Sequence, residues 1–73
     1  MCVALPGRIV WIGEGSTGSI PGRVSFGEQV RDVDLVMVAE AVVGDHVIVH
    51  SGYAIRVVDA RELARIREVV DLP

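Results

Sequence analysis

Residues 44–58 read GDHVIVHSGYAIRVV, and this stretch decides the class of fold. It opens with a Gly-Asp turn signal, and residues 46–50 then form a short run rich in β-branched side chains. A Ser-Gly break separates this run from residues 53–58, which have the same character. Two short strands joined by a tight turn are therefore predicted, and they indicate a mainly β protein.

The N-terminal half repeats this alternation of short strands and turns. Residues 8–12 are β-branched and aromatic, follow a Pro-Gly pair, and lead into a glycine-rich loop. Residues 20–26 continue as a partner strand, although Pro21 and Gly22 indicate an edge position, a bulge or a later start at Arg23.

A third strand is predicted over residues 30–35. There Asp32 and Asp34 alternate with apolar residues, which predicts a solvated strand face for the two carboxylates. Several short strands separated by glycine-containing turns predict a small closed or nearly closed β-barrel.

The last segment has the pattern of a helix. Asp59 can serve as an N-cap, and Glu62 stands three residues later, as in a capping box. A helix over residues 59–70 would need to dock on the barrel or on a partner, because a helix of this length is marginal alone in water. The chain is thus predicted to be one domain over residues 1–73, with a barrel and N-terminal cysteine arm at 1–58. The apolar residues of the expected helix fall near one face: Ala60, Leu63, Ile66, Val69 and Val70.

Composition argues against several classes of partner. The 73 residues carry a net charge of -3, and all seven basic residues are scattered arginines. Nucleic-acid binding needs a basic stripe, so it is not expected. No apolar run approaches the roughly 20 residues that span a bilayer, so no membrane partner is expected either. A single cysteine excludes an intrachain disulfide, and a reducing, cytoplasmic location is the simplest expectation.

Two motifs that are associated with cofactors or catalysis lack the neighbouring elements or residues that such sites require. Residues 13–18 match GxGxxG, but another β-rich run follows where a dinucleotide site requires a helix, so no nucleotide cofactor is expected. Asp32 and Asp34 have no adjacent acid, base or oxyanion group that would complete a catalytic set. An enzymatic activity is therefore not expected.

The two histidines bound the strand predicted over residues 46–50. On a strand they point to the same face, but about 13 Å of chain separates them, which is too far for both to bind one metal ion directly. His46 is expected to pack at the surface or in a turn. His50 precedes the Ser-Gly break, where it can be structural or can be presented to a partner or ligand.

Cys2 is the only thiol, and it directly follows the initiator methionine. Excision of Met1 would leave an α-amine and a thiol on adjacent carbons, a pair able to chelate a metal. A thiolate is a soft ligand that suits iron, copper(I) or zinc. The alternative is an incidental exposed cysteine. Pro6 and Gly7 fix the chain just beyond it.

Three segments together resemble the HypC/HupF family of hydrogenase maturation chaperones. They are MCVALPGRIV at residues 1–10, VDLV at 33–36 and VGDHVIVHSGYAI at 43–55. The resemblance runs in order over most of the chain. It implies a small OB-like β-barrel with a C-terminal α-helix.

The resemblance also implies a function in assembling the nickel-iron site of hydrogenases. Cys2 would contact iron carried transiently as the Fe(CN)2CO group, and His50 would support the iron site or the complex. The implied partners are the HypD scaffold protein and the precursor of the hydrogenase large subunit. Residues that match the family pattern and would shape the terminus and barrel are Pro6, Gly7, Gly44, Asp45, Gly52, Tyr53 and Ala54.

The chain also departs from the family pattern. Val3, Leu5, His46 and Ser51 differ in side chain from the usual residues, and the loop over residues 13–22 is longer, which leaves the particular partner open. The alternative function is that of a small barrel that acts as an adaptor without metal, binding another protein through its surface.

Overall fold

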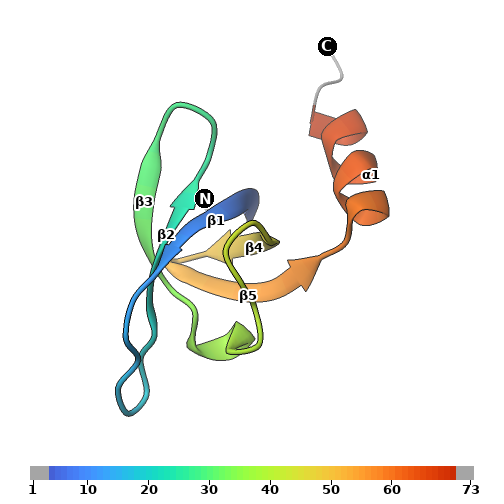
Figure 1. The fold of residues 1–73 in the computed structure, drawn as a ribbon. Coiled ribbons are helices and arrows are strands. Elements are labelled where there is room, and N and C mark those ends of the chain that lie inside the picture. Colours follow the sequence, from blue (N-terminus) through green and yellow to red (C-terminus); the bar gives the residue numbers. More distant parts are fainter. Residues whose placement is uncertain (1–3, 71–73) are drawn as a thin grey trace.

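Five strands close into a barrel, and one helix follows it (Figure 1). The computed structural model describes residues 4–70, with side chains described as far as Ile66. Neighbouring strands follow the order β1-β2-β3-β5-β4, and the barrel is closed. The expected OB-like barrel with a C-terminal helix is thus confirmed. The elements are β1 (Leu5–Ile12), β2 (Pro21–Ser25), β3 (Val30–Asp34), the 3-10 helix η1 (Val36–Val38), β4 (His46–His50), β5 (Tyr53–Val58) and α1 (Ala60–Val70).

Strand β1 pairs with strands on both sides and is longer than the sequence predicts. Its first half pairs with β4, beginning at Leu5 opposite Val49, so the strand starts three residues before Arg8. Its second half pairs with β2, where Val10 is an extra residue between two paired positions. Such a bulge bends a strand and increases its twist, which helps a small sheet to close.

The start of β2 corrects one expectation. The strand begins at Pro21, so a later start at Arg23 is wrong. It lies between β1 and β3, so an edge position is wrong too. Proline is tolerated here because it is the first residue of the strand. The bulge of this strand pair lies instead at Val10 of β1, opposite Val24 and Arg23 of β2.

The barrel core is aliphatic and small. Gly22 makes room for Leu35, since a Cβ at this glycine would lie 2.7 Å from the Leu35 Cγ. Helix η1, which the sequence analysis did not predict, buries Val38 in this cluster. Each fully buried valine or leucine contributes about 1.5–3 kcal/mol relative to an exposed one. The buried cluster consists of Ile9, Val24, Val33, Leu35, Val38, Val47 and Ala54.

Helix α1 begins as the sequence predicts. The Asp59 Oδ1 accepts a hydrogen bond of 2.8 Å from the Glu62 backbone N–H, so Asp59 is the N-cap. The Glu62 side chain instead forms a 2.5 Å ion pair with Arg56 of β5. Leu63 packs against Ile48 and Val58, which confirms docking on the barrel.

Within the described chain, no helix has both the length and the apolar character needed to cross a bilayer.

Asp34 joins three parts of the fold. Its Oδ1 accepts hydrogen bonds from the Ile20 N–H at 3.1 Å and the Val36 N–H at 3.0 Å, and its Oδ2 accepts one from the Ser19 hydroxyl at 3.0 Å. Its own N–H donates to the Gly52 carbonyl at 2.9 Å, where β3 meets β5. The expected solvated face is therefore wrong for Asp34, although Asp32 is exposed.

These hydrogen bonds favour the ionised form of Asp34. Those from the Ile20 and Val36 N–H groups hold the pKa of its carboxyl below the ordinary value of 3.8, with a smaller contribution from Ser19. The folded carboxyl thus binds a proton more weakly than the unfolded one. Its contribution to stability is fully present above 3.8 and is lost as the pH falls through the lower, folded pKa.

We expect Asp34→Ala to lower the urea midpoint of unfolding at neutral pH, because two backbone N–H groups and one hydroxyl lose their acceptor. The deficit relative to the wild type should shrink in acid, below about pH 4. Urea unfolding followed by circular dichroism at several pH values measures both effects. Asp32→Ala, on the exposed face of the same strand, is the matched control. Equal midpoints for the two variants at neutral pH would contradict this role for Asp34.

Candidate functional site

Strand β1 begins beside the turn between β4 and β5. Leu5 is the first residue of β1 and pairs with Val49, the residue before His50, in antiparallel strands. Cys2 lies outside the described residues. It is two residues from Ala4, which is at most about 7 Å of extended chain. The start of β1 and His50 therefore lie at the same end of the barrel.

The turn that presents His50 has a defined geometry. Ser51 and Gly52 both have positive φ, 54° and 82°, as in the two-residue hairpin turn that matches the twist of a β-sheet. His50 is the last residue of β4 and is half-buried. Its Nδ1 lies 3.3 Å from the Ser51 hydroxyl. Among the described residues the ring's Nε2 has no hydrogen-bond partner.

His46 lies at the opposite end of β4. It pairs with Val58 of β5 and with Arg8 of β1, near the start of α1. Among the described side chains, no three His, Cys, Asp or Glu residues lie close enough to hold a metal ion together. The two histidines thus belong to different regions of the surface.

The other residues matched to the family pattern divide between the two ends of the barrel. Near the N-terminal end, Pro6 and Gly7 pair with Ile48 and Val47. A Cβ at Gly7 would lie 2.8 Å from the Phe26 ring, so this close approach of β1 to β2 requires glycine. Tyr53 is 43% exposed beside the turn.

Of the matched residues, Ala54 lies in the core, and Gly44 and Asp45 lie in a turn. Ala54 is fully buried in the core. Gly44 has a φ of 101°, which glycine adopts without strain, and its N–H donates to the Ile9 carbonyl at 2.9 Å. The Asp45 carboxylate accepts a 3.0 Å hydrogen bond from the Val42 N–H and stabilises the turn. Gly44 and Asp45 lie beyond the far end of β4 from His50.

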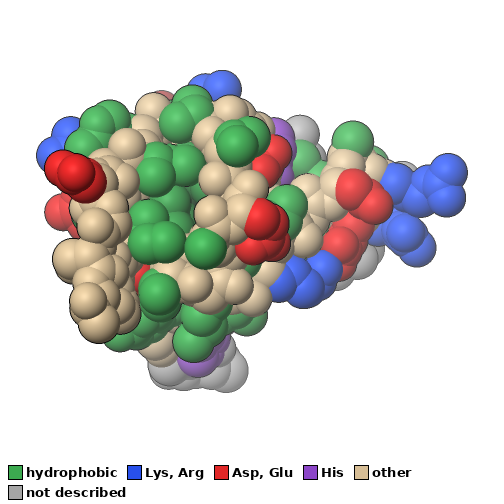
Figure 2. All heavy atoms as spheres, turned by 60° about the horizontal axis from the view of Figure 1, so that its bottom comes forward, with side chains coloured by type: hydrophobic (Ala, Val, Ile, Leu, Met, Phe, Trp, Pro, Cys, Tyr) green, Lys and Arg blue, Asp and Glu red, His purple; other side chains and the backbone are tan. Residues whose placement is uncertain are grey.

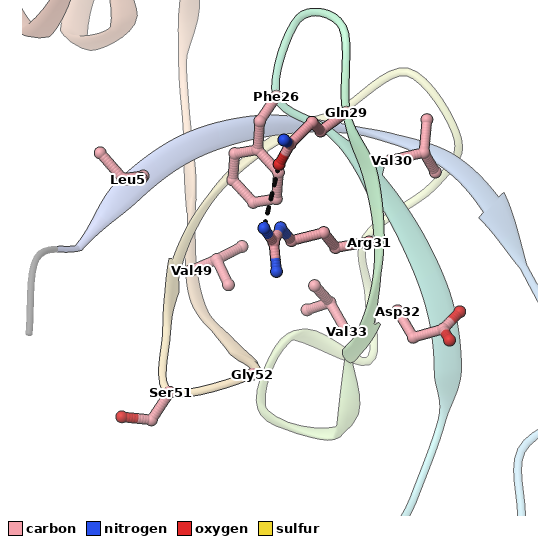
Figure 3. Close-up of a pocket in the computed structure, with 10 residues that line it drawn as sticks. All are labelled: Leu5, Phe26, Gln29, Val30, Arg31, Asp32, Val33, Val49, Ser51 and Gly52. Atoms are coloured by element: carbon pink, nitrogen blue, oxygen red, sulfur yellow. Dashed lines mark hydrogen bonds between the residues drawn. The ribbon is translucent and has the colours of Figure 1, made fainter.

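A groove of about 640 Å³ opens at the same end of the barrel as the start of β1 (Figure 3). Leu5, Phe26 and Val49 supply apolar walls, and Gly52 belongs to the lining. Figure 3 shows the Arg31 side chain extending into the groove, where it donates a 3.0 Å hydrogen bond to the Gln29 Oε1.

Sequence reasoning missed the groove and Arg31, although a signal was present. Arg31 has the same alternation phase as Val33 and Leu35, both buried, so its side chain had to point to the inner face of β3. A charged residue on the inner face indicates a place where the barrel is open.

A second exposed surface lies around η1. Met37, Val42 and Val43, from η1 and the loop that follows it, are 63%, 60% and 58% exposed. Figure 2 turns this end of the molecule forward and shows hydrophobic side chains close together across it. Exposed apolar surface of this kind is typical of contacts with other proteins.

The chain is similar to known proteins over most of its length. The HupF/HypC family model matches residues 1–70. The chain is 44% identical to "Hydrogenase maturation factor HypC" of Synechocystis sp. over 73 residues, covering 99% of this chain and 93% of that protein. It is 40% identical to "Hydrogenase maturation factor HypC" of Cupriavidus necator over 65 residues, covering 89% of this chain and 68% of that protein. The chain therefore belongs to the HupF/HypC family.

Proposed function

We propose that this protein is a hydrogenase maturation factor that carries or guides the Fe(CN)2CO group through Cys2. The observation that carries the proposal is the pairing of Leu5 with Val49, which sets the start of β1 next to the residue that precedes His50. Similarity to two hydrogenase maturation factors over most of the chain supports it. The family is one of non-enzymatic chaperones, as the sequence analysis expected.

In this proposal the Cys2 thiolate is the iron ligand. Excision of Met1 gives it full access, and its softness suits iron that already carries cyanide and carbon monoxide. Binding must be firm enough to collect the iron group and weak enough to release it. A ligand on a short terminal segment meets this requirement, because ordering the segment on binding lowers its affinity. The barrel then provides the surface to which the partner proteins bind.

The proposed partners are the HypD scaffold protein, on which the iron group is assembled, and the precursor of the hydrogenase large subunit, which receives it. His50 would support the exchange from the rim of the barrel, by a hydrogen bond from Nε2 to the thiolate or to the iron group. We place this exchange in the cytoplasm.

The exposed apolar surface around Met37, Val42 and Val43 favours a second candidate function, that of a metal-free adaptor. An adaptor would bind its partners through this surface without using the thiol. The two functions therefore differ in their dependence on Cys2.

We expect Cys2→Ser to abolish maturation of the hydrogenase that this protein serves, because a serine hydroxyl is a poor ligand for soft iron. Hydrogenase activity in cells that produce only the variant measures this, and a circular dichroism spectrum like that of the wild type shows that the fold is kept. Undiminished maturation would rule out the Cys2 mechanism and leave the adaptor.

His50 and His46, at the two ends of β4, provide a test variant and a matched control for the proposed role of His50. His50→Gln should lower the rate of maturation by roughly tenfold, the usual effect of losing a group that supports a metal ligand. His46→Gln, at the opposite end of the strand, should leave the rate unchanged. The same hydrogenase assay with both variants tests this, and equal losses in the two would remove His50 from the proposed site.

A further inference from the structure

Strand β3 has one paired edge and one largely unpaired edge. It pairs with β2 along its whole length, from Val30 to Asp34. On its other side, within residues 4–70, its one strand partner is Tyr53 of β5, opposite Asp34. The unpaired part of this edge borders the groove, whose lining includes residues 30–33 (Figure 3).

The register shows which backbone groups of β3 face the groove. The Asp34 N–H points away from β2, since it donates to the Gly52 carbonyl at 2.9 Å. Backbone groups in a strand alternate between its two sides. The N–H and C=O of Val30 and Asp32 therefore also point away from β2. Two residues thus offer a donor and an acceptor each along the groove.

The side chains of the groove add a charge to this edge. The Arg31 guanidinium extends into the groove from the inner face of β3 and bonds Gln29, a neutral residue. Among the described residues, no carboxylate forms an ion pair with it. The groove walls made by Leu5, Phe26 and Val49 are apolar, and the exposed Arg31 guanidinium is free to form charge-assisted hydrogen bonds with an incoming carboxylate.

We propose that this groove binds an extended acidic segment of a partner protein, which adds to the free edge of β3 as an antiparallel strand. Two residues of the segment would exchange four main-chain hydrogen bonds with Val30 and Asp32. The residue between them would stand opposite Arg31. Because directly opposed residues of antiparallel strands share a face, its side chain would enter the groove, and an Asp or Glu there would pair with the guanidinium.

Charge complementarity also argues against a second copy of this chain as the occupant. Antiparallel pairing of two β3 edges through Val30 and Asp32 would set Arg31 opposite Arg31 of the other copy. Like charges directly opposite one another are destabilising. The inward-pointing arginine therefore disfavours self-association of the edge and favours an acidic partner.

The groove also has a consequence for the iron group, and this step rests on the proposed function. Leu5 lines the groove, and Cys2 is three residues before it. A segment bound along β3 would thus lie in the groove that Leu5 lines, at the start of β1. The acidic strand would belong to the protein with which the iron group is exchanged.

Peptide binding to the full chain tests the proposal. The probes are the acetylated, amidated pentapeptides Thr-Val-Glu-Val-Thr and Thr-Val-Lys-Val-Thr, titrated into isotope-labelled protein by NMR. The glutamate peptide should shift the amide signals of Val30 and Asp32 and slow their hydrogen exchange. The lysine peptide should bind at least about tenfold more weakly. Equal binding of the two peptides, or no effect on these amides, would overturn the proposal.

A pair of variants at one position isolates the backbone contribution. Asp32→Pro removes an N–H that faces the groove and is not used in pairing with β2, whereas Asp32→Ala keeps it. Asp32→Pro should abolish binding of the glutamate peptide, and Asp32→Ala should retain it; preserved binding in the proline variant would contradict strand addition. NMR spectra of both variants without peptide check the fold.

Two further measurements distinguish a partner segment from a second copy of this chain, and the groove proposal from the Cys2 proposal. Cys2→Ser should bind the glutamate peptide like the wild type. Peptide binding therefore tests the groove proposal independently of whether Cys2 binds iron. Shifts of the Val30 and Asp32 amides that grow with protein concentration alone would show a second copy on this edge and would overturn the choice of occupant.

Discussion

The bridge between β3 and β5, made at Asp34 and Tyr53, closes the barrel and sets the arrangement of everything around it. The Asp34 carboxylate holds the end of the β1–β2 connection through Ser19 and Ile20, and it holds the start of η1 through Val36. Because closure is concentrated at this residue, the rest of β3 is released from β5. An open groove at one end of the barrel is the direct consequence.

That end of the molecule combines three features that come from distant parts of the sequence. Pairing of Leu5 with Val49 places the start of β1 there, and the turn after β4 presents His50. The free edge of β3 and Arg31 border the same opening. A strand start, a histidine and a free strand edge at one end of the barrel are consistent with the proposal that metal and partner are handled together. At the opposite end, Gly44 and Asp45 form a turn through backbone hydrogen bonds, and α1 begins.

The sequence was most informative where structure depends on neighbouring residues. The cap at Asp59 and the Ser-Gly turn before β5 follow from side-chain chemistry and φ preferences, and both were predicted. Asp34 was misjudged as solvated because its partners, Ser19 and Ile20, are 14 or 15 residues away and no periodicity reveals them. Arg31 could have been placed on the inner face by alternation, but the opening that receives it depends on where β3 and β5 separate. The role of Cys2 rests on the family resemblance and is a proposal about chemistry.

The most direct test of the account is infrared spectroscopy of this protein purified in complex with its maturation partner, compared with the Cys2→Ser variant in the same complex. Cyanide and carbon monoxide stretching bands should accompany the wild-type complex. They should be lost or shifted in the variant complex while the two proteins still copurify, because in the proposed mechanism the thiolate is a ligand of the iron. Identical bands in both complexes would show that Cys2 does not bind the iron group and would contradict the central claim.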